Sequence, residues 1–190
     1  IKINEKSNTD TAISILVLGG SQAAEIFAKI LPSIFIQCKK SNMKIKIFQQ
    51  CLPHQINQLK NTYDKSKIDY ELFSFTFNIL KYYKSTNLVI TRAGSSALAE
   101  LLNCNIPIIT VPLESSAENH QYKNAQYFNK KGYGIMIEEK NLRNKLFDLL
   151  HSIHEDKSVI NSIKQNQDKH TDKNVFDIIN KKIINLFYES

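Results

Sequence analysis

The stretch 87–100, Asn-Leu-Val-Ile-Thr-Arg-Ala-Gly-Ser-Ser-Ala-Leu-Ala-Glu, combines residue types that can bind an anion and a sugar. An apolar run at 88–90 ends in a small polar turn, Thr91–Ser95, and a helical pattern starts directly after it. Because the first N–H groups of a helix carry partial positive charge, such a strand–turn–helix junction favours phosphate binding. Glu100 follows about one and a half turns into the helix, where its carboxylate can accept hydrogen bonds from sugar hydroxyls. The stretch predicts a ligand of the nucleotide type.

A second candidate loop is Leu-Gly-Gly-Ser-Gln at 18–22. Two glycines allow a tight turn and close backbone approach, and the Ser21 hydroxyl and the following N–H groups can bind a phosphate. The run is not a Walker loop, which needs Gly-Lys-Ser/Thr. It is not the dinucleotide G-x-G-x-x-G either, because Ala23 and Ala24 stand where further glycines are needed. A plain strand-to-helix turn explains this loop equally well when it is taken alone.

A third polar group, Asn119-His120-Gln121, follows an apolar run that ends at Pro112. Neutral amide and imidazole groups suit the hydroxyls of a sugar. Taken alone, His120 has the ordinary explanation of a surface histidine. We expect no metal site, since no Cys or second His lies nearby, and the serines at 95 and 96 lack the G-x-S-x-G setting of a hydrolase nucleophile.

The elements that must position these loops alternate along the chain. Strands are expected at 14–18, 44–49, 69–73, 88–90, 106–111 and 134–138. Helices are expected at 21–37 with an interruption at Pro32, and at 54–63, 78–84, 96–102 and 118–130. This alternation predicts an α/β fold, a Rossmann-like parallel sheet with helices on both faces, with its core at about 13–140.

A helical extension is expected over 141–190. Its first apolar stripe consists of Leu142, Leu146, Leu149, Leu150 and Ile153, and its second of Val175, Ile178, Ile179, Ile183 and Leu186. We expect these helices to pack on their own domain, although an amphipathic terminal helix also suits a membrane or a partner. The polar stretch 164–174 between the stripes is interpreted as a mobile surface segment or the frayed end of a helix.

Composition excludes several classes of protein. The 190 residues suit one domain with a helical extension, and no apolar run is long enough to cross a bilayer. Cys38, Cys51 and Cys104 form no C-x-x-C pair, so we expect reduced thiols in a cytosolic protein rather than a disulfide framework or a zinc site. The first residue is not Met, so a fragment or a continuation of a longer chain is expected.

The net charge of +7 is concentrated in one segment, 26–67, where eight lysines face the single acid Asp64. Such a segment can meet phosphate groups or an anionic membrane surface. A solvated face is favoured, because the whole chain is rich in Lys, Asn and Ile. Nucleic acid is not an expected partner, since no aromatic or Arg-rich motif accompanies the lysines.

The three loops all follow strands, and ligands of open α/β sheets bind at the carboxyl ends of the strands. The sequences of these loops and their order closely resemble those in the C-terminal half of the MurG family. These are the bacterial UDP-N-acetylglucosamine (UDP-GlcNAc) transferases that convert lipid I to lipid II in peptidoglycan synthesis. The resemblance covers about 13–187 and rests on four runs: Gly-Gly-Ser-Gln at 19–22, Thr-Arg-Ala-Gly-Ser-Ser-Ala-Leu-Ala-Glu at 91–100, Ile-Pro-Ile-Ile-Thr-Val-Pro at 106–112, and Asn-His-Gln at 119–121 with Asn124-Ala125. It implies one half of a two-Rossmann (GT-B) glycosyltransferase, with the N-terminal acceptor domain absent from this chain.

The resemblance also implies roles for particular residues. Ser21 contacts the diphosphate, and the main chain of Thr76 pairs with uracil. The turn and helix start at 95–99 face the α-phosphate, and Glu100 holds the ribose hydroxyls. Gln121, with His120 beside it, contacts the transferred sugar, and Arg92 has a supporting or diphosphate role. The implied donor-site residues are Gly19, Gly20, Ser21, Gln22, Thr76, Arg92, Gly94, Ser95, Ser96, Ala97, Leu98, Ala99, Glu100, His120 and Gln121.

The chain departs from the family pattern at Ala23, where a glycine is usual and an extra methyl group can crowd the diphosphate, and in the loop after Pro112. The family's catalytic base lies in the half that is missing here. The resemblance therefore implies that this half supplies no catalytic residue and needs no cofactor or metal. Alone, the chain is expected to bind UDP-GlcNAc weakly without turnover.

The implied partners are UDP-GlcNAc, an N-terminal Rossmann half that is missing or a separate chain, and a lipid-linked acceptor at the membrane. The full enzyme would be an inverting hexosyltransferase, cytoplasmic and peripheral on the cytoplasmic face of the inner membrane. Two alternatives stay open. One is a GT-B transferase with another UDP-sugar or acceptor, and the other is a non-catalytic nucleotide-sugar-binding module.

Overall fold

A six-stranded, wholly parallel sheet forms the centre of the molecule in the computed structural model, which describes residues 12–170 apart from the side chains of 21–24 and 117. The strand order is β3-β2-β1-β4-β5-β6. The strands are β1 (Ile13–Leu18), β2 (Ile45–Gln50), β3 (Asp69–Phe73), β4 (Leu88–Thr91), β5 (Ile108–Thr110) and β6 (Ile135–Met136). This is the doubly wound order, in which the chain reverses its direction of travel across the sheet between β1 and β4.

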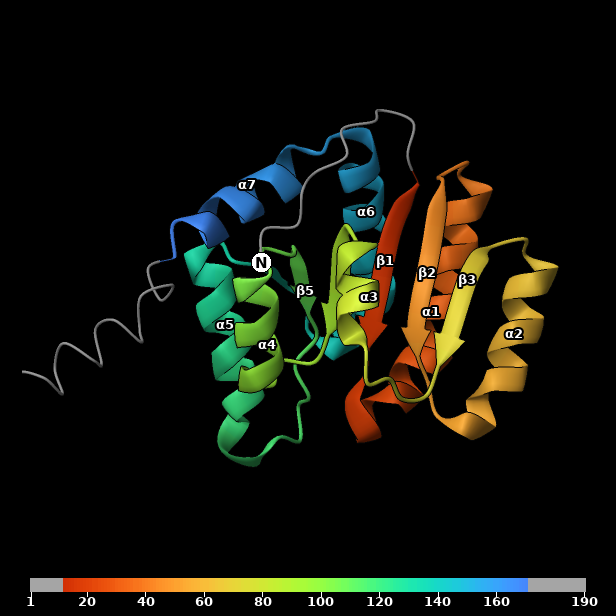
Figure 1. Ribbon diagram of the computed structural model, residues 1–190, viewed down its shortest axis with the longest axis horizontal. Helices are drawn as coiled ribbons and strands as arrows, with labels where there is room; N and C mark the ends of the chain where they lie inside the picture. Colours follow the sequence, from red (N-terminus) through yellow and green to blue (C-terminus); the bar gives the residue numbers. More distant parts are fainter. Residues whose placement is uncertain (1–11, 171–190) are drawn as a thin grey trace, which may run out of the picture.

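Helices cover both faces of the sheet (Figure 1). One face carries α1 (Gly20–Lys40), α2 (Ile56–Lys65) and α6 (Leu142–Glu155), and the other carries α3 (Ile79–Lys84), α4 (Ser95–Asn103) and α5 (His120–Lys131). Three short 3-10 turns, η1 (Pro53–Gln55), η2 (Ala117–Asn119) and η3 (Glu139–Asn141), precede α2, α5 and α6. The last described helix is α7 (Ser158–Asp168), which contacts α6. The predicted α/β sheet with helices on both faces is confirmed.

Strand periodicity divides the core into two clusters. In β1, Ile15 and Val17 point toward α1 and α6, whereas Leu16 points toward α3 and α4. Side chains of a strand alternate between faces, and a sheet covered on both sides requires apolar residues on each. This requirement explains why β1 and β4 have almost continuous apolar sequences.

Pro32 does not interrupt the first helix, contrary to expectation. It lies inside α1, which continues for 21 residues, and its ring is buried. Proline removes one main-chain donor. The residues around it keep the helix in place, since Leu31, Ile34 and Phe35 on either side of it are buried against the sheet.

The polar stretch expected at 164–174 is the end of a helix in its described part, whereas 171–174 lie outside the described residues. Its described part to Asp168 is the last turn of α7, and Gln167 is buried there. The Gln167 Nε2 donates hydrogen bonds to the carbonyls of Ile106 (3.0 Å) and Tyr133 (2.7 Å). These bonds fasten α7 to the amino ends of β5 and β6. The second expected stripe, 175–186, lies outside the described residues.

Smaller differences concern strand length. The strand expected at 106–111 is hydrogen-bonded as β5 only over Ile108–Thr110, and the last strand is reduced to the edge pair Ile135–Met136. Within residues 12–170 no helix has the length and apolar character that crossing a membrane requires.

Candidate functional site

The predicted loops leave the sheet at one edge. In Figure 1 the strand arrows point to this edge, and the connections after β1, β4 and β5 all start there. Because β1 and β4 are hydrogen-bonded neighbours, with Leu18 paired to Thr91, the starts of α1 and α4 follow adjacent strand ends. Ligands of open α/β sheets bind at this position, where the strand order reverses.

The loop after β1 is very short. Gly19 is the N-cap of α1, and Gly20 has φ +64°, a conformation that glycine adopts without steric cost. Gly19 has no side chain to cap the helix, and the first N–H of the helix, that of Gly20, donates to Oε1 of Gln50 (3.3 Å). The side chains of Ser21 and Gln22 lie outside the described part of the structure, so their predicted contacts with a diphosphate stay predictions.

At the start of α4 the N-cap is Gly94, and no described side chain caps this helix. A Cβ atom built on Gly94 would meet no atom within 4 Å, and φ is −68°, so neither packing nor backbone conformation demands glycine there. The open space lies in front of N–H groups that a helix leaves without internal partners. An anion can therefore approach the main chain of α4 closely.

The residues of the predicted run 95–99 divide by exposure. Ser95, Ser96 and Ala99 are exposed, and Ala97 is half-buried. Leu98 is fully buried in the cluster between α4 and the sheet. Its side chain is therefore part of the core, and only its main chain is available at the rim.

Glu100 lies on the exposed side of α4 that faces α3. Burial raises the pKa of Tyr83, and the charge of the nearby Glu100 carboxylate raises it further. Tyr83 itself is buried on α3. The Glu100 carboxylate therefore lies next to the buried Tyr83 of α3. Helix α3 follows the loop that contains Thr76.

Gln121 joins the loops after β4 and β5. Its Oε1 accepts hydrogen bonds from the main-chain N–H groups of Ala93 (3.3 Å) and Leu113 (3.1 Å), while Asn124 Nδ2 donates to the Ala93 carbonyl (3.0 Å). The Gln121 side-chain carbonyl is thus used within the protein. His120 is exposed at the first position of α5.

Arg92 points into the protein and is only 8% exposed. Its Nη1 donates to the carbonyls of Val111 (3.1 Å) and Pro112 (3.2 Å) and lies 2.6 Å from Oε2 of Glu139. The guanidinium also lies 5.2 Å from the ring centre of Phe27 on α1. The guanidinium is thus occupied by contacts within the protein, and both predicted roles of Arg92 stay predictions.

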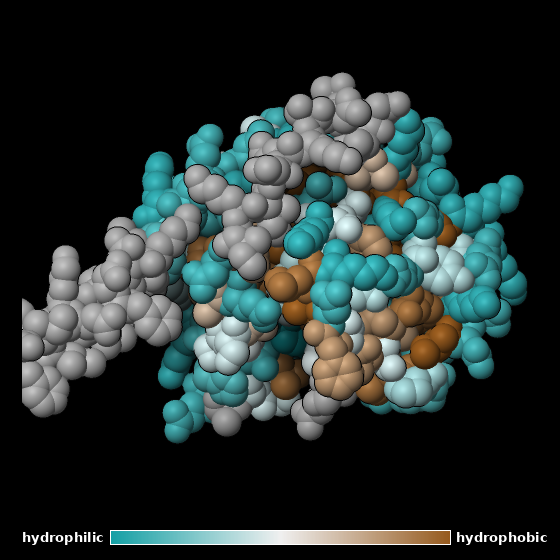
Figure 2. All heavy atoms as spheres, in the orientation of Figure 1, coloured by the Kyte–Doolittle hydropathy of each residue, from teal (hydrophilic) through white to brown (hydrophobic). Residues whose placement is uncertain are grey.

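Thr76 lies in the loop between β3 and α3, where its Oγ1 accepts a hydrogen bond from the Asn78 N–H. Its neighbours Phe75 and Phe77 are 69% and 98% exposed and contact each other edge to face, with ring centres 4.8 Å apart. Hydrophobic side chains gather in this part of the surface, below α3 in Figure 2. The sequence analysis did not single out Phe77.

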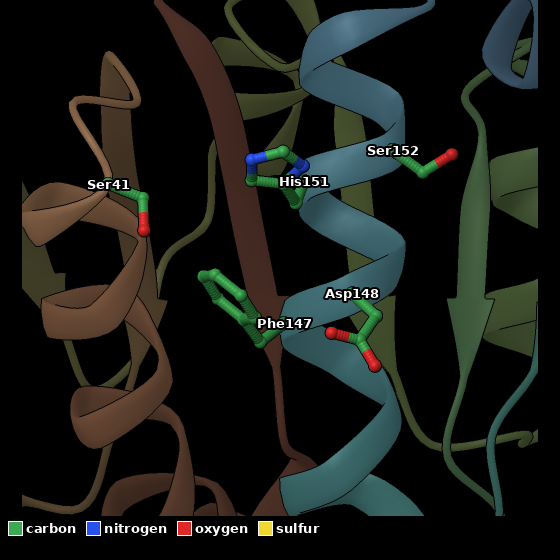
Figure 3. Close-up of a pocket in the computed structure, with 5 residues that line it drawn as sticks. All are labelled: Ser41, Phe147, Asp148, His151 and Ser152. Carbon is green, nitrogen blue, oxygen red and sulfur yellow. The ribbon is translucent and has the colours of Figure 1, made fainter.

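Two hollows are lined by none of the three predicted loops. One has a volume of about 450 Å³ and is lined by Ser41 at the end of α1 and by residues of α6. Figure 3 shows Phe147 and His151 directed toward Ser41, while Ser152 points away. Although Asp148, His151 and serines occur together, no hydrogen bond connects them among the described residues. The other hollow, of about 520 Å³, lies between α1 and α2.

The carboxyl edge combines features that nucleotide-binding α/β domains use. Two adjacent helix starts offer main-chain donors, a carboxylate lies beyond one of them, and side-chain amides lie at the neighbouring loop. Comparison with known families identifies the class further. Residues 14–181 match the family described as "Glycosyltransferase family 28 C-terminal domain". The chain belongs to this family.

Curated relatives carry more specific names. A UDP-N-acetylglucosamine--N-acetylmuramyl-(pentapeptide) pyrophosphoryl-undecaprenol N-acetylglucosamine transferase of Pelagibacter ubique is 35% identical over 183 residues, which cover 94% of this chain and 50% of that protein. The protein of the same name from Rickettsia typhi is 38% identical over 167 residues, covering 86% of this chain and 43% of the relative. This chain thus spans about half the length of these relatives.

Among solved structures, Acinetobacter baumannii MurG superposes with a TM-score of 0.77 at 22% identity, covering 94% of this chain and 55% of that one. At this identity the likeness concerns the fold. The predicted resemblance to the C-terminal half of the MurG family is confirmed by the family match and by these relatives.

Sequence reasoning missed the residues that hold the site together. The sequence motif included Asn124 without predicting a role for it, and no role was predicted for Glu139 or Gln50 either. A polar residue at the end of a buried strand, as at Gln50, was the available signal, because such a position lies at the ligand edge of a parallel sheet.

Proposed function

We propose that this chain is the donor-binding half of a glycosyltransferase that transfers N-acetylglucosamine from UDP-GlcNAc to a lipid-linked acceptor. The observation that carries the proposal is the pair of adjacent helix starts with glycine N-caps, Gly19 and Gly94, with Glu100 beyond the second. Relatives at 35–38% identity are named for this transfer, and this chain covers about half of their length.

The proposed chemistry follows from the charges involved. Breaking the bond between the sugar C1 and the diphosphate leaves negative charge on UDP. Main-chain N–H groups and the positive end of a helix dipole stabilise such charge when they are already in place before the reaction. In our proposal the starts of α1 and α4 bind the diphosphate, Glu100 binds the ribose hydroxyls, and the Thr76 main chain pairs with uracil.

The amide nitrogen of Gln121, with His120 beside it, is proposed to contact hydroxyls of the transferred sugar. Attack by an acceptor hydroxyl on C1 from the face opposite the diphosphate inverts the configuration at that carbon. We place the general base that activates the hydroxyl in a second, N-terminal half. The lipid-linked acceptor and the contact with the cytoplasmic face of the membrane belong to the complete enzyme in this proposal.

Calorimetry on the full 190-residue chain with UDP-GlcNAc, UDP-glucose, UDP and ADP tests the ligand. We expect binding of UDP-GlcNAc and UDP and none of ADP. Glu100→Ala should lower the affinity for UDP at least tenfold, because a carboxylate–hydroxyl contact is charge-assisted. Glu118→Ala, at an exposed carboxylate of the next loop, is the matched control. Absence of UDP binding by the folded chain contradicts the proposal, and preference for UDP-glucose assigns another donor sugar.

Transfer itself is tested in a chimaera in which this chain replaces the corresponding half of the Pelagibacter relative. We expect transfer of N-acetylglucosamine to the lipid-linked acceptor by the chimaera and none by the isolated chain. Turnover by the isolated chain would show that a base lies in this half.

A further inference from the structure

Gln50 connects two loops at the carboxyl edge that the proposed function assigns to different parts of one ligand. Its Oε1 accepts a hydrogen bond from the main-chain N–H of Gly20 (3.3 Å), and its Nε2 donates to the carbonyl of Ser74 (3.4 Å). Gly20 belongs to the turn after β1, and Ser74 begins the loop after β3. One side chain thus links the turn at the proposed diphosphate to the loop at the proposed base.

The strand order explains why this residue makes the link. β2 lies between β1 and β3, and Gln50 is its last residue. In the register of the sheet Gln49 pairs with Val17 and Gln50 pairs with Phe73. Gln50 is therefore level with the ends of both neighbouring strands, where a side chain of its length reaches the loops on either side.

The end of β2 is itself firmly held. Gln49, the residue before, is fully buried, and its Oε1 accepts a hydrogen bond of 2.6 Å from the Tyr63 hydroxyl on α2. After Gln50, the Cys51 N–H donates to the Phe73 carbonyl (2.9 Å), and the Leu52 N–H donates to Oε1 of Gln55 (2.9 Å). Gln50 thus extends from a fixed position, and its two hydrogen bonds locate the loops relative to the sheet.

We infer that Gln50 is a positioning residue for the donor nucleotide, one that sets the diphosphate turn and the base loop at the spacing that UDP requires. This inference rests on the proposed function. A ligand that touches only one of the two loops can be accommodated by movement of that loop. UDP must engage both at once, so the link matters most for a ligand that spans them.

The test compares three ligands on the full chain: UDP, uridine and pyrophosphate. Gln50→Met keeps the side-chain length and removes both hydrogen bonds. We expect UDP to bind about tenfold more weakly to this variant, a change on the scale of two lost hydrogen bonds, whereas uridine and pyrophosphate each change less than about threefold. Gln58→Met, on the exposed side of α2, is the matched control and should bind all three like the parent chain.

A merely structural role has a different signature. If Gln50→Met weakens all three ligands by the same factor, or none of them, the inference is wrong. Gln50→Glu provides a second measurement, because its carboxylate still accepts from Gly20 and can no longer donate to Ser74. It should also weaken UDP more than uridine, and equal weakening would contradict the link. Failure of UDP to bind the parent chain overturns the proposed function instead, so the two failures are distinguishable.

Discussion

Arg92 and Glu139 form a largely buried ion pair, with Nη1 and Oε2 2.6 Å apart and side chains only 10% and 27% exposed. The pair joins the end of β4 to the turn η3 that starts α6. Because Arg92 also donates to two carbonyls of the loop after β5, one guanidinium holds three segments at the site edge.

Loss of this guanidinium should therefore be costly. We expect Arg92→Met to lower the free energy of unfolding by about 3 kcal/mol, because it leaves Glu139 and two carbonyls poorly paired. The double variant Arg92→Met/Glu139→Leu should recover part of that loss. Urea unfolding of the parent, the single variants and the double variant measures the difference. Additive losses in the double variant would contradict a direct coupling between the two side chains.

Substitution by alanine should lower the UDP affinity but not the stability at Gly94, and the stability but not the UDP affinity at Gly134. At Gly94 a Cβ meets open space, so Gly94→Ala should change the unfolding free energy by less than about 0.5 kcal/mol. The new methyl group stands before the α4 N–H groups and should lower UDP affinity about tenfold. Calorimetry and urea unfolding measure the two effects.

At Gly134 a Cβ would lie 2.7 Å from the Ile108 carbonyl oxygen. Gly134→Ala should therefore destabilise the fold by about 1–3 kcal/mol while the remaining folded protein binds UDP normally. A destabilised Gly94→Ala variant with unchanged affinity would place the ligand elsewhere.

Tyr83 should influence nucleotide binding through Glu100. Tyr83→Phe removes the hydroxyl next to this carboxylate and keeps the buried ring, so we expect about a threefold loss of UDP affinity. Tyr82→Phe is a matched control, since the Tyr82 hydroxyl donates to a different carboxylate, that of Glu71, at 2.8 Å. Equal effects of the two substitutions on UDP affinity would argue against the predicted ribose contact of Glu100.

The thiol of Cys38 predicts a dependence of stability on alkaline pH. Burial raises its pKa from 9.0 to about 11, against a smaller lowering by a main-chain hydrogen bond. The folded state holds the thiol proton more tightly than the unfolded state, so this stabilisation is complete below pH 9 and is lost as the pH rises toward 11.

The measurement for Cys38 compares the parent chain with Cys38→Ala. The stability advantage of the parent over the variant should shrink by about 1.4 kcal/mol between pH 8 and pH 10. Urea unfolding under reducing conditions at several pH values gives this difference. An advantage that stays constant over the range would mean that the thiol is accessible to water in the folded chain.

Local sequence determined much of the fold. The apolar runs before Gly19 and Arg92 specify buried parallel strands, and the glycines after them specify where helices begin. Since all strands are parallel, their carboxyl ends share one edge, and this requirement alone brings the predicted loops together. Pro32 was misjudged because the packing of α1 on the sheet outweighs a local preference.

Tertiary structure decided which way the side chains point and which partners they meet. Gln50 links two loops only because β2 lies between β1 and β3, and Gln121 turns its carbonyl inward only because α5 starts beside Ala93. Arg92 points into the protein, where its guanidinium meets Glu139, 47 positions later in the chain. Such contacts join residues that are distant in sequence, so they depend on strand order, which periodicity and turn residues do not encode.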